Sequence, residues 1–310
     1  MPVLTQHWRR MKITSPVCIR ALSADAELLR EMAPPSCGTA VIHSVFERVV
    51  NLEFGDGRLA TLAYSGSDDA PGTVVAEARG WSGFGLQPGG PAWYADGLIV
   101  LGDALVITLE HARPWHGDLP PFARNRHLLG SNLPLARDFV ERYGKGLALH
   151  RPKQPPTECD PALIKSFQRA VRRLWVALVR NDMPHAEEHA RQLVGLGPGV
   201  TPAGDDFLMG LMGVLNIPGS PGYALRRLGD TVVECALLRT HAISLVSLHH
   251  AARGRVPASV IRLCEALMRA RPTTMLAELD HVLRIASSSG TEIAAGVLAG
   301  FALHLQLEHA

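Results

Sequence analysis

Apolar and polar positions follow two different periods along this chain, and the period changes once. In the first part, short runs of apolar and β-branched residues alternate with turn residues such as Asp56-Gly57 and Gly102-Asp103. The runs lie at residues 41–46, 49–54, 59–64, 74–78, 98–101 and 104–109. This alternation predicts an antiparallel β domain, either a barrel or a sandwich.

Helical periodicity dominates the second part of the chain, and a separate helix is predicted over Asn132–Tyr143. We expect Asp160-Pro161 to open the first helix of the second part as N-cap and first helical residue. The proline-rich stretch at residues 150–156 interrupts regular structure between these helices. The sequence therefore predicts an α+β protein: a β-rich N-terminal domain, residues 1–150, precedes an all-helical C-terminal domain, residues 151–310, each with its own core.

The composition is that of an ordinary folded protein. A chain of 310 residues is long enough for two cores, and 47% of its residues are hydrophobic and 19% are charged. The 31 basic and 29 acidic residues leave a net charge of +2, and no basic run is interleaved with aromatic residues, so nucleic acid is not an expected partner. The first fifteen residues lack an apolar targeting segment, and no window of about 18 uncharged apolar residues occurs. We therefore expect a cytoplasmic protein that does not enter a membrane.

The cysteines argue against disulfides and against a thiolate metal site. Their number is odd, they are scattered, and no Cys-x-x-Cys pair occurs, so we expect reduced, mostly buried thiols. They are Cys18, Cys37, Cys159, Cys235 and Cys264.

A glycine-rich phrase, Gly197-Pro198-Gly199-Val200-Thr201-Pro202-Ala203-Gly204-Asp205-Asp206, precedes an apolar helix. Gly197 and Gly199 allow positive φ and close approach of the backbone to a ligand, and Thr201-Pro202 is typical of an N-cap followed by the first helical residue. The first-turn N–H groups, with Gly204 and the Thr201 hydroxyl, would then face a phosphate or a carboxylate. The alternative is a glycine-rich turn that only caps a core helix.

A second segment repeats this plan. With Gly290 placed over Gly204, both segments fit G-x-[DE]-φ-x-x-G, so Glu292 corresponds to Asp206. We expect two helices that pack through glycine and alanine with converging N-termini, so that both acids reach one pocket. The second loop adds Ser289, Gly290 and Thr291 to this pocket. The alternative is helix packing through small residues with solvent-exposed caps.

The two adjacent aspartates are expected to divide roles, because neighbouring helical residues project about 100° apart. We assign Asp206 to the pocket and Asp205 to the loop or to a basic partner. Two like charges about 4 Å apart repel by about 4 kcal/mol at an effective dielectric near 20. Asp206 beside a phosphate therefore requires Mg²⁺, an arginine or a proton.

A polar stripe on the helix predicted over residues 231–253 could supply the positive charge. Thr240, Ser244 and Ser247 recur at helical spacing there, and Arg239 is the best candidate for a substrate-binding cation. The hydroxyls have an alternative role, since buried serines often bond back to the i−4 carbonyl.

One further motif, His185-Ala186-Glu187-Glu188-His189, matches the H-x-x-E-H pattern of inverted zinc proteases. It follows Asp182-Met183-Pro184 at the start of an amphipathic helix. We therefore interpret it as a solvated helix face rather than a zinc site.

Three phrases together resemble the DUF2877 family over roughly residues 40–305. They are Gly197–Leu208, Ser289–Glu292 with Ala295-Gly296, and Val41–Phe46 with Val50–Leu52. One branch of that family is a subunit of the bacterial oxamate carbamoyltransferase of allantoin degradation. The family usually has Ser at the position of Ala203 and Asp at the position of Glu292, and these departures leave room for a different substrate.

The resemblance implies carbamoyl transfer between a ureido acid such as oxalurate and phosphate, giving carbamoyl phosphate and an amide acid, in a complex with other subunits. The sequence leaves two questions open: whether Mg²⁺ is a cofactor and whether the chain forms a homo-oligomer. Two other hypotheses stand beside this one. The chain could be a non-catalytic assembly subunit, or a metal-dependent phosphotransferase that uses Asp205 and Asp206.

Overall fold

The computed structural model describes residues 16–123, 126–148, 160–286 and 288–308. The chain separates into two compact units, Met1–His116 and Gly117–Ala310, each with its own hydrophobic core. The division lies earlier in the chain than residue 150, because the helix over His127–Tyr143 packs on helices of the second unit. The expected linker at residues 150–156 lies outside the described residues.

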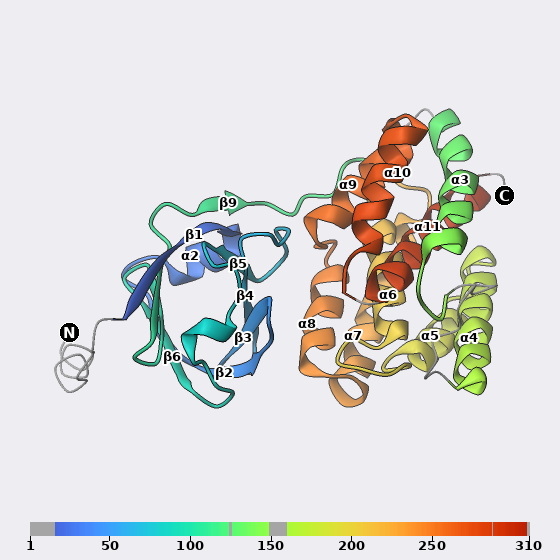
Figure 1. Cartoon of the computed structure of the whole chain (residues 1–310). Helices are drawn as coiled ribbons and strands as arrows, with labels where there is room; N and C mark the ends of the chain where they lie inside the picture. Colours follow the sequence, from blue (N-terminus) through green and yellow to red (C-terminus); the bar gives the residue numbers. More distant parts are fainter. Residues whose placement is uncertain (1–15, 124–125, 149–159, 287, 309–310) are drawn as a thin grey trace. The chain divides into compact units, whose positions relative to one another are not determined.

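The first unit is a closed barrel of eight strands, which confirms one of the two β architectures expected (Figure 1). Its strands run in the order β5-β4-β3-β2-β6-β7-β8-β1, and β1 pairs back with β5. The strands are β1 (Val17–Asp25), β2 (Cys37–Val45), β3 (Val49–Phe54), β4 (Leu59–Ala63), β5 (Thr73–Ala76), β6 (Pro91–Ala95), β7 (Leu98–Leu101) and β8 (Leu105–Thr108), with helix α2 (Ala26–Met32) after β1. Closure leaves few free edges, which limits edge-to-edge association.

The barrel is not wholly antiparallel. β1 is parallel to β8, β4 is parallel to β5, and a short strand β9 (Arg113–Trp115) is parallel to β1. Side chains such as Leu52, Leu62 and Ile107 are at most 1% exposed and fill the core of this unit. An eight-stranded barrel is just wide enough to be filled in this way.

The N-terminal phrase that carries the family resemblance has a structural role in the barrel. Asn51 is 3% exposed, its amide Nδ2 donates to the Ser44 hydroxyl at 2.9 Å, and its Oδ1 accepts from the Thr61 hydroxyl at 2.8 Å. This network joins β2, β3 and β4 beside the bulge at His43. A buried amide with both ends bonded stabilises one strand register.

The second unit is helical throughout its regular structure (Figure 1). Its helices are α3 (His127–Tyr143), α4 (Pro161–Val179), α5 (Met183–Leu193), α6 (Ala203–Leu215), α7 (Leu228–Arg239), α8 (Ala242–Ala251), α9 (Ala258–Arg269), α10 (Pro272–Leu283) and α11 (Ser289–Leu307). Asp160 caps α4 as predicted, since its carboxylate accepts from the Ala162 N–H. The order of a β-rich part followed by a helical part is thus confirmed.

Helix α11 is long and apolar enough to span a bilayer by length and composition, but 72% of that window is buried inside the protein. This burial is typical of a core helix. The thiols are partly as expected, since Cys18, Cys37, Cys235 and Cys264 are free. Cys18 and Cys37 are exposed rather than buried, and Cys159 lies outside the described residues.

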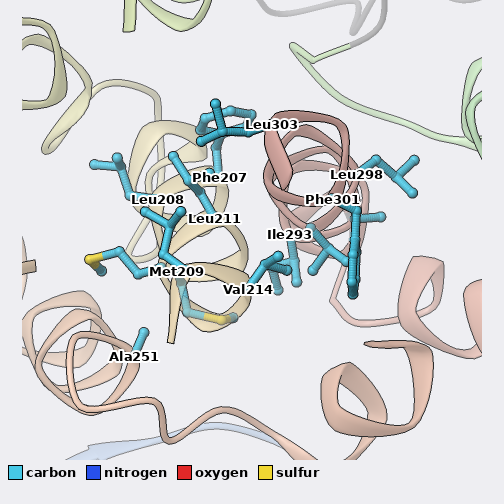
Figure 2. Packing of buried hydrophobic residues seen from close by; sticks show 14 of the residues in the cluster. Phe207, Leu208, Met209, Leu211, Val214, Ala251, Ile293, Leu298, Phe301 and Leu303 are labelled. Atoms are coloured by element: carbon cyan, nitrogen blue, oxygen red, sulfur yellow. The ribbon is translucent and has the colours of Figure 1, made fainter. Parts of the chain in front are cut away.

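Helices α6 and α11 pack closely in parallel, as the shared glycine spacing predicts. A Cβ on Gly210 would collide with the Ile293 carbonyl of α11, and a Cβ on Gly296 would collide with the Phe207 carbonyl of α6. Further along, a Cβ on Gly300 would lie 2.7 Å from Val214 Cβ. Figure 2 shows the apolar side chains that fill the space around these two helices. Glycine lets the two backbones touch, so both helix starts lie at the same end.

The loops before α6 and α11 are built alike. A Cβ on Gly204 would collide with the carbonyl of Leu193, the last residue of α5, and a Cβ on Gly290 would collide with the Val282 carbonyl near the end of α10. The sequence repeat therefore corresponds to two helix–loop–helix units, α5–α6 and α10–α11, that face each other through α6 and α11.

Two helix boundaries differ from the sequence expectation. Helix α6 begins at Ala203 with Pro202 as its cap residue, one position later than Thr201 and Pro202 predict. The single helix expected over residues 231–253 is two helices, because Thr240 is extended, with φ −131° and ψ 174°. The Thr240 hydroxyl bonds the carboxylate of Asp205, a tertiary contact that helical periodicity does not report.

Replacement of Gly210 by alanine should therefore lower the free energy of unfolding by about 1–3 kcal/mol, because the two helix backbones must separate. Gly130→Ala is the matched control: this glycine is also helical, and a Cβ there meets nothing within 4 Å. The control should keep or slightly raise stability. Urea denaturation of both variants measures the difference, and equal stabilities would contradict the packing described here.

Candidate functional site

Two buried acids lie at the adjoining starts of α6 and α11. Asp206 is 8% exposed and Glu292 is 1% exposed, each in the first turn of its helix. The loops before them meet where the Thr201 and Ser289 hydroxyls lie 3.1 Å apart. The Ser289 hydroxyl also bonds Asp206, and the charge of Asp206 raises the pKa of Glu292. The structure thus brings the two predicted acids together.

A third segment, residues 144–148 after α3, covers Glu292 and was not anticipated. The Leu147 N–H donates to Glu292 Oε1, and the Lys145 N–H donates to the Thr291 hydroxyl at 2.8 Å. A side chain on Gly146 would collide with the Glu292 carboxyl. The glycines of Gly144-Lys145-Gly146 signal a tight backbone path in the sequence, but they do not say which helix start that path approaches.

Burial raises the pKa values of both acids towards neutrality. The pKa of Asp206 rises to about 7 mainly because of desolvation, against the hydrogen bond from Ser289 and with a further increase from the charge of Asp205. The pKa of Glu292 rises to about 8 for the same main reason, against the N–H of Leu147 and with an increase from Asp206. Glu292 Oε2 is buried and has no hydrogen-bond partner among the described residues. Near neutral pH the pair therefore holds a proton, which suits acid–base chemistry.

Asp205 occupies a different environment and ties three segments together. Its Oδ1 accepts the Gly195 N–H at 2.8 Å, and its Oδ2 accepts the Thr240 hydroxyl. Ser244 also bonds it, and the net effect of burial is a raised pKa. Asp205, Thr240 and Ser244 thus hold the loop against the junction of α7 and α8. Both carboxylate oxygens of Asp205 are used by the protein.

The first-turn N–H groups of α6 do not point outward as expected. The Gly204 N–H donates to the Leu196 carbonyl at 2.8 Å, and the N–H groups of Asp205 and Asp206 donate to the Pro202 carbonyl. Gly197 and Gly199 do have positive φ, at 127° and 88°. The loop uses this freedom to fold back on its own helix start, so those donors are satisfied internally.

The second loop behaves in the same way. The Gly290 N–H donates to the Ile285 carbonyl at 3.1 Å, and the Thr291 N–H donates to the Ser288 carbonyl at 2.8 Å. The Ser289 hydroxyl bonds Asp206, and the Thr201 hydroxyl lies 3.1 Å from the Ser289 hydroxyl, so both side chains lie beside the acid pair.

Arg239 and Ser247 have other contacts. The exposed Arg239 guanidinium donates to the Arg191 carbonyl at 2.7 Å, and the Ser247 hydroxyl bonds back to the Ile243 carbonyl. His185 bonds Asp182 at 2.7 Å on the surface of α5. Within the described ranges, no cluster of three or more His, Cys, Asp or Glu side chains is arranged to hold a metal ion.

Models of one protein family match both units of the chain. Residues 193–301 match the model of the oxamate carbamoyltransferase subunit AllH, and residues 20–114 match the AllH family N-terminal domain. No solved structure matches the chain. The first match contains both loops and both acids, and the second contains nearly all of the barrel.

Replacement of Glu292 by glutamine should stabilise the protein at alkaline pH. The folded-state pKa, about 8, exceeds the ordinary value of 4.5, so the native state keeps a proton that the unfolded chain has lost. Stability therefore falls as pH rises from about 4.5 to about 8. Glutamine imitates the protonated acid, so Glu292→Gln should raise Tm at pH 8 by at least about 3 °C, with a smaller gain at pH 5.

The control for this pH series is Glu234→Gln on the exposed face of α7. Its Tm difference from the wild type should not change with pH. A Tm gain in Glu292→Gln that is equal at pH 5 and pH 8, or a loss at both, would contradict a raised pKa at Glu292.

Proposed function

Because the chain belongs to the family of oxamate carbamoyltransferase subunit AllH, we propose that it supplies the acid–base group for carbamoyl transfer between a ureido acid and phosphate. The observation that carries this proposal is the buried pair Asp206 and Glu292, whose pKa values are raised to about 7 and about 8. A group that titrates near the working pH is both a usable acid and a usable base.

The reaction requires one proton to move. A hydrogen phosphate oxygen attacks the carbamoyl carbon of a ureido acid such as oxalurate, and the bond from that carbon to the internal nitrogen breaks. The products are carbamoyl phosphate and an amide acid, here oxamate. The proton of hydrogen phosphate must reach the departing nitrogen, because an amide anion is a poor leaving group. We assign this transfer to Asp206, the more exposed member of the pair.

Protonation of Asp206 also removes the charge repulsion between this side chain and phosphate. An ionised Asp206 would repel phosphate by about 4 kcal/mol at about 4 Å and an effective dielectric near 20. A carboxyl that is neutral when phosphate arrives removes this repulsion. The hydroxyls of Thr201 and Ser289, 3.1 Å apart, are the side chains that bind substrate in this proposal. Ser289, Gly290 and Thr291 on one side and Gly197, Gly199 and Gly204 on the other shape the approach.

The family description speaks of a subunit, so we propose that the chain acts with other subunits, in the cytoplasm. A specific observation favours a second candidate. Glu292 is 1% exposed and is bonded by Leu147, which also suits a structural joint in a non-catalytic assembly subunit. The experiment below separates the two candidates.

The test uses the assembled complex with oxalurate and phosphate, and it measures carbamoyl phosphate. Asp206→Asn should lower kcat by a factor of about 100 or more without loss of assembly, since an amide cannot carry the proton. Asp230→Asn is the matched control, because Asp230 is an exposed acid in the first turn of α7. Its turnover should match the wild type.

Two further arms identify the charge partner. If turnover by the wild-type complex is unchanged by EDTA but Arg239→Ala lowers kcat by a factor of about 100, Arg239 stabilises charge in the reaction. If EDTA abolishes turnover and Mg²⁺ restores it, a metal does so instead. If Asp206→Asn leaves turnover and assembly unchanged, the acid pair is a structural joint and the assembly-subunit candidate is the correct one.

A further inference from the structure

A large groove on the helical unit is lined by none of the residues assigned to the reaction above. It has a volume of about 1410 Å³ and lies among α3, α4, α6 and α11. Buried Phe167, Phe207 and Leu298 belong to its apolar lining, together with the half-buried ring of Trp175. A groove of this size exceeds the roughly 300–1,000 Å³ that a drug-sized ligand needs, so it is far larger than a site for phosphate alone.

The charged side chains that line the groove are mainly basic, with Asp138 and Glu141 as the two acids among them. Arg142 is paired with Asp138 at 2.9 Å. Four other basic side chains that line the groove have no ion-pair partner among the described residues, and they are Arg137, Lys165, Arg169 and Arg172. Unpaired cations beside an apolar floor favour a ligand that has both an anionic and an apolar part.

The basic lining continues past the groove along one face of α4. A second hollow of about 590 Å³ shares Arg169 and Arg172 with the first and adds Arg173 and Arg180. Lys165, Arg169 and Arg172 recur at helical spacing, so they lie on one side of α4, and Arg180 is the cap residue at its end. A row of cations of this kind suits a chain of phosphates better than a single charge.

We propose that this groove binds a nucleoside di- or triphosphate. The ring system stacks on Trp175 above the apolar floor, and the phosphates lie across Arg169 and Arg172 towards the second hollow. An aromatic ring can stack on any nucleobase, and a guanidinium group can donate two parallel hydrogen bonds to one phosphate. The groove borders the acid pair through Ala148, Phe207 and Ala295, but neither Asp206 nor Glu292 lines it. Nucleotide binding is measured without carbamoyl transfer, so the two proposals are tested independently.

Calorimetric titration of the full chain with ATP, ADP and inorganic triphosphate at physiological salt tests the proposal. ATP and ADP should bind with micromolar affinity. Arg169→Ala/Arg172→Ala should weaken this binding at least about tenfold, since it removes two charged hydrogen-bond donors. The matched control is Arg226→Ala/Arg227→Ala, which removes two exposed charges from the same unit away from both hollows. Its affinity should match the wild type.

Trp175→Leu separates the ring from the phosphates. It should weaken ATP binding and leave triphosphate binding unchanged, with circular dichroism confirming the fold of each variant. Four results would overturn the proposal: no binding of ATP or ADP at millimolar concentration, equal loss in both arginine double variants, no effect of Trp175→Leu on ATP, or displacement of ATP by polyglutamate at far lower concentration. The last result would identify a docking surface for an acidic protein.

Discussion

The close parallel contact of α6 and α11 is the constraint on which the candidate site depends. Glycine at positions 210 and 296 lets each helix backbone touch the carbonyls of the other, and any Cβ there would hold the helices apart. Because the helices are parallel, their starts and the two loops meet at one end. The same proximity removes Asp206 and Glu292 from water. Desolvation then raises both pKa values, so the chemistry of the site follows from the packing of two helices.

The sequence predicts this part of the structure well because the relevant signal is local. The shared spacing of an acid and a glycine four residues later indicates both the smooth face and the acid above it. The choice between barrel and sandwich is different in kind. It depends on the pairing of β1 with β5, whose partners Ala21 and Ala76 are distant in sequence, and on strands that return in parallel. Alternation of apolar residues predicts the strands but not how the sheet closes.

Three features of the site that the sequence does not predict depend on hydrogen bonds between segments or on the path of a loop. Residues 144–148 reach Glu292 through backbone N–H groups, which every residue type carries. The break at Thr240 depends on its bond to Asp205, and the inward first-turn donors depend on the path of the loop that Gly197 and Gly199 permit. Propensity and periodicity do not report such contacts. For that reason the sequence predicts that the loop at residues 197–204 offers its backbone N–H groups to an anion. In the structure the loop uses these donors itself.

Helix packing does not explain why positions 206 and 292 carry acidic residues. Glycine accounts for the contact of α6 and α11 in both halves of the repeat, and an apolar or neutral residue at positions 206 and 292 would avoid the desolvation of a carboxyl. The neighbouring acid, Asp205, does have a structural explanation, since both of its oxygens bond to the protein. Glu292, by contrast, has a buried oxygen without a partner among the described residues. An acid therefore recurs at the same place in both repeats of one chain where stability argues against it, and this recurrence supports the acid–base role that we propose for the pair.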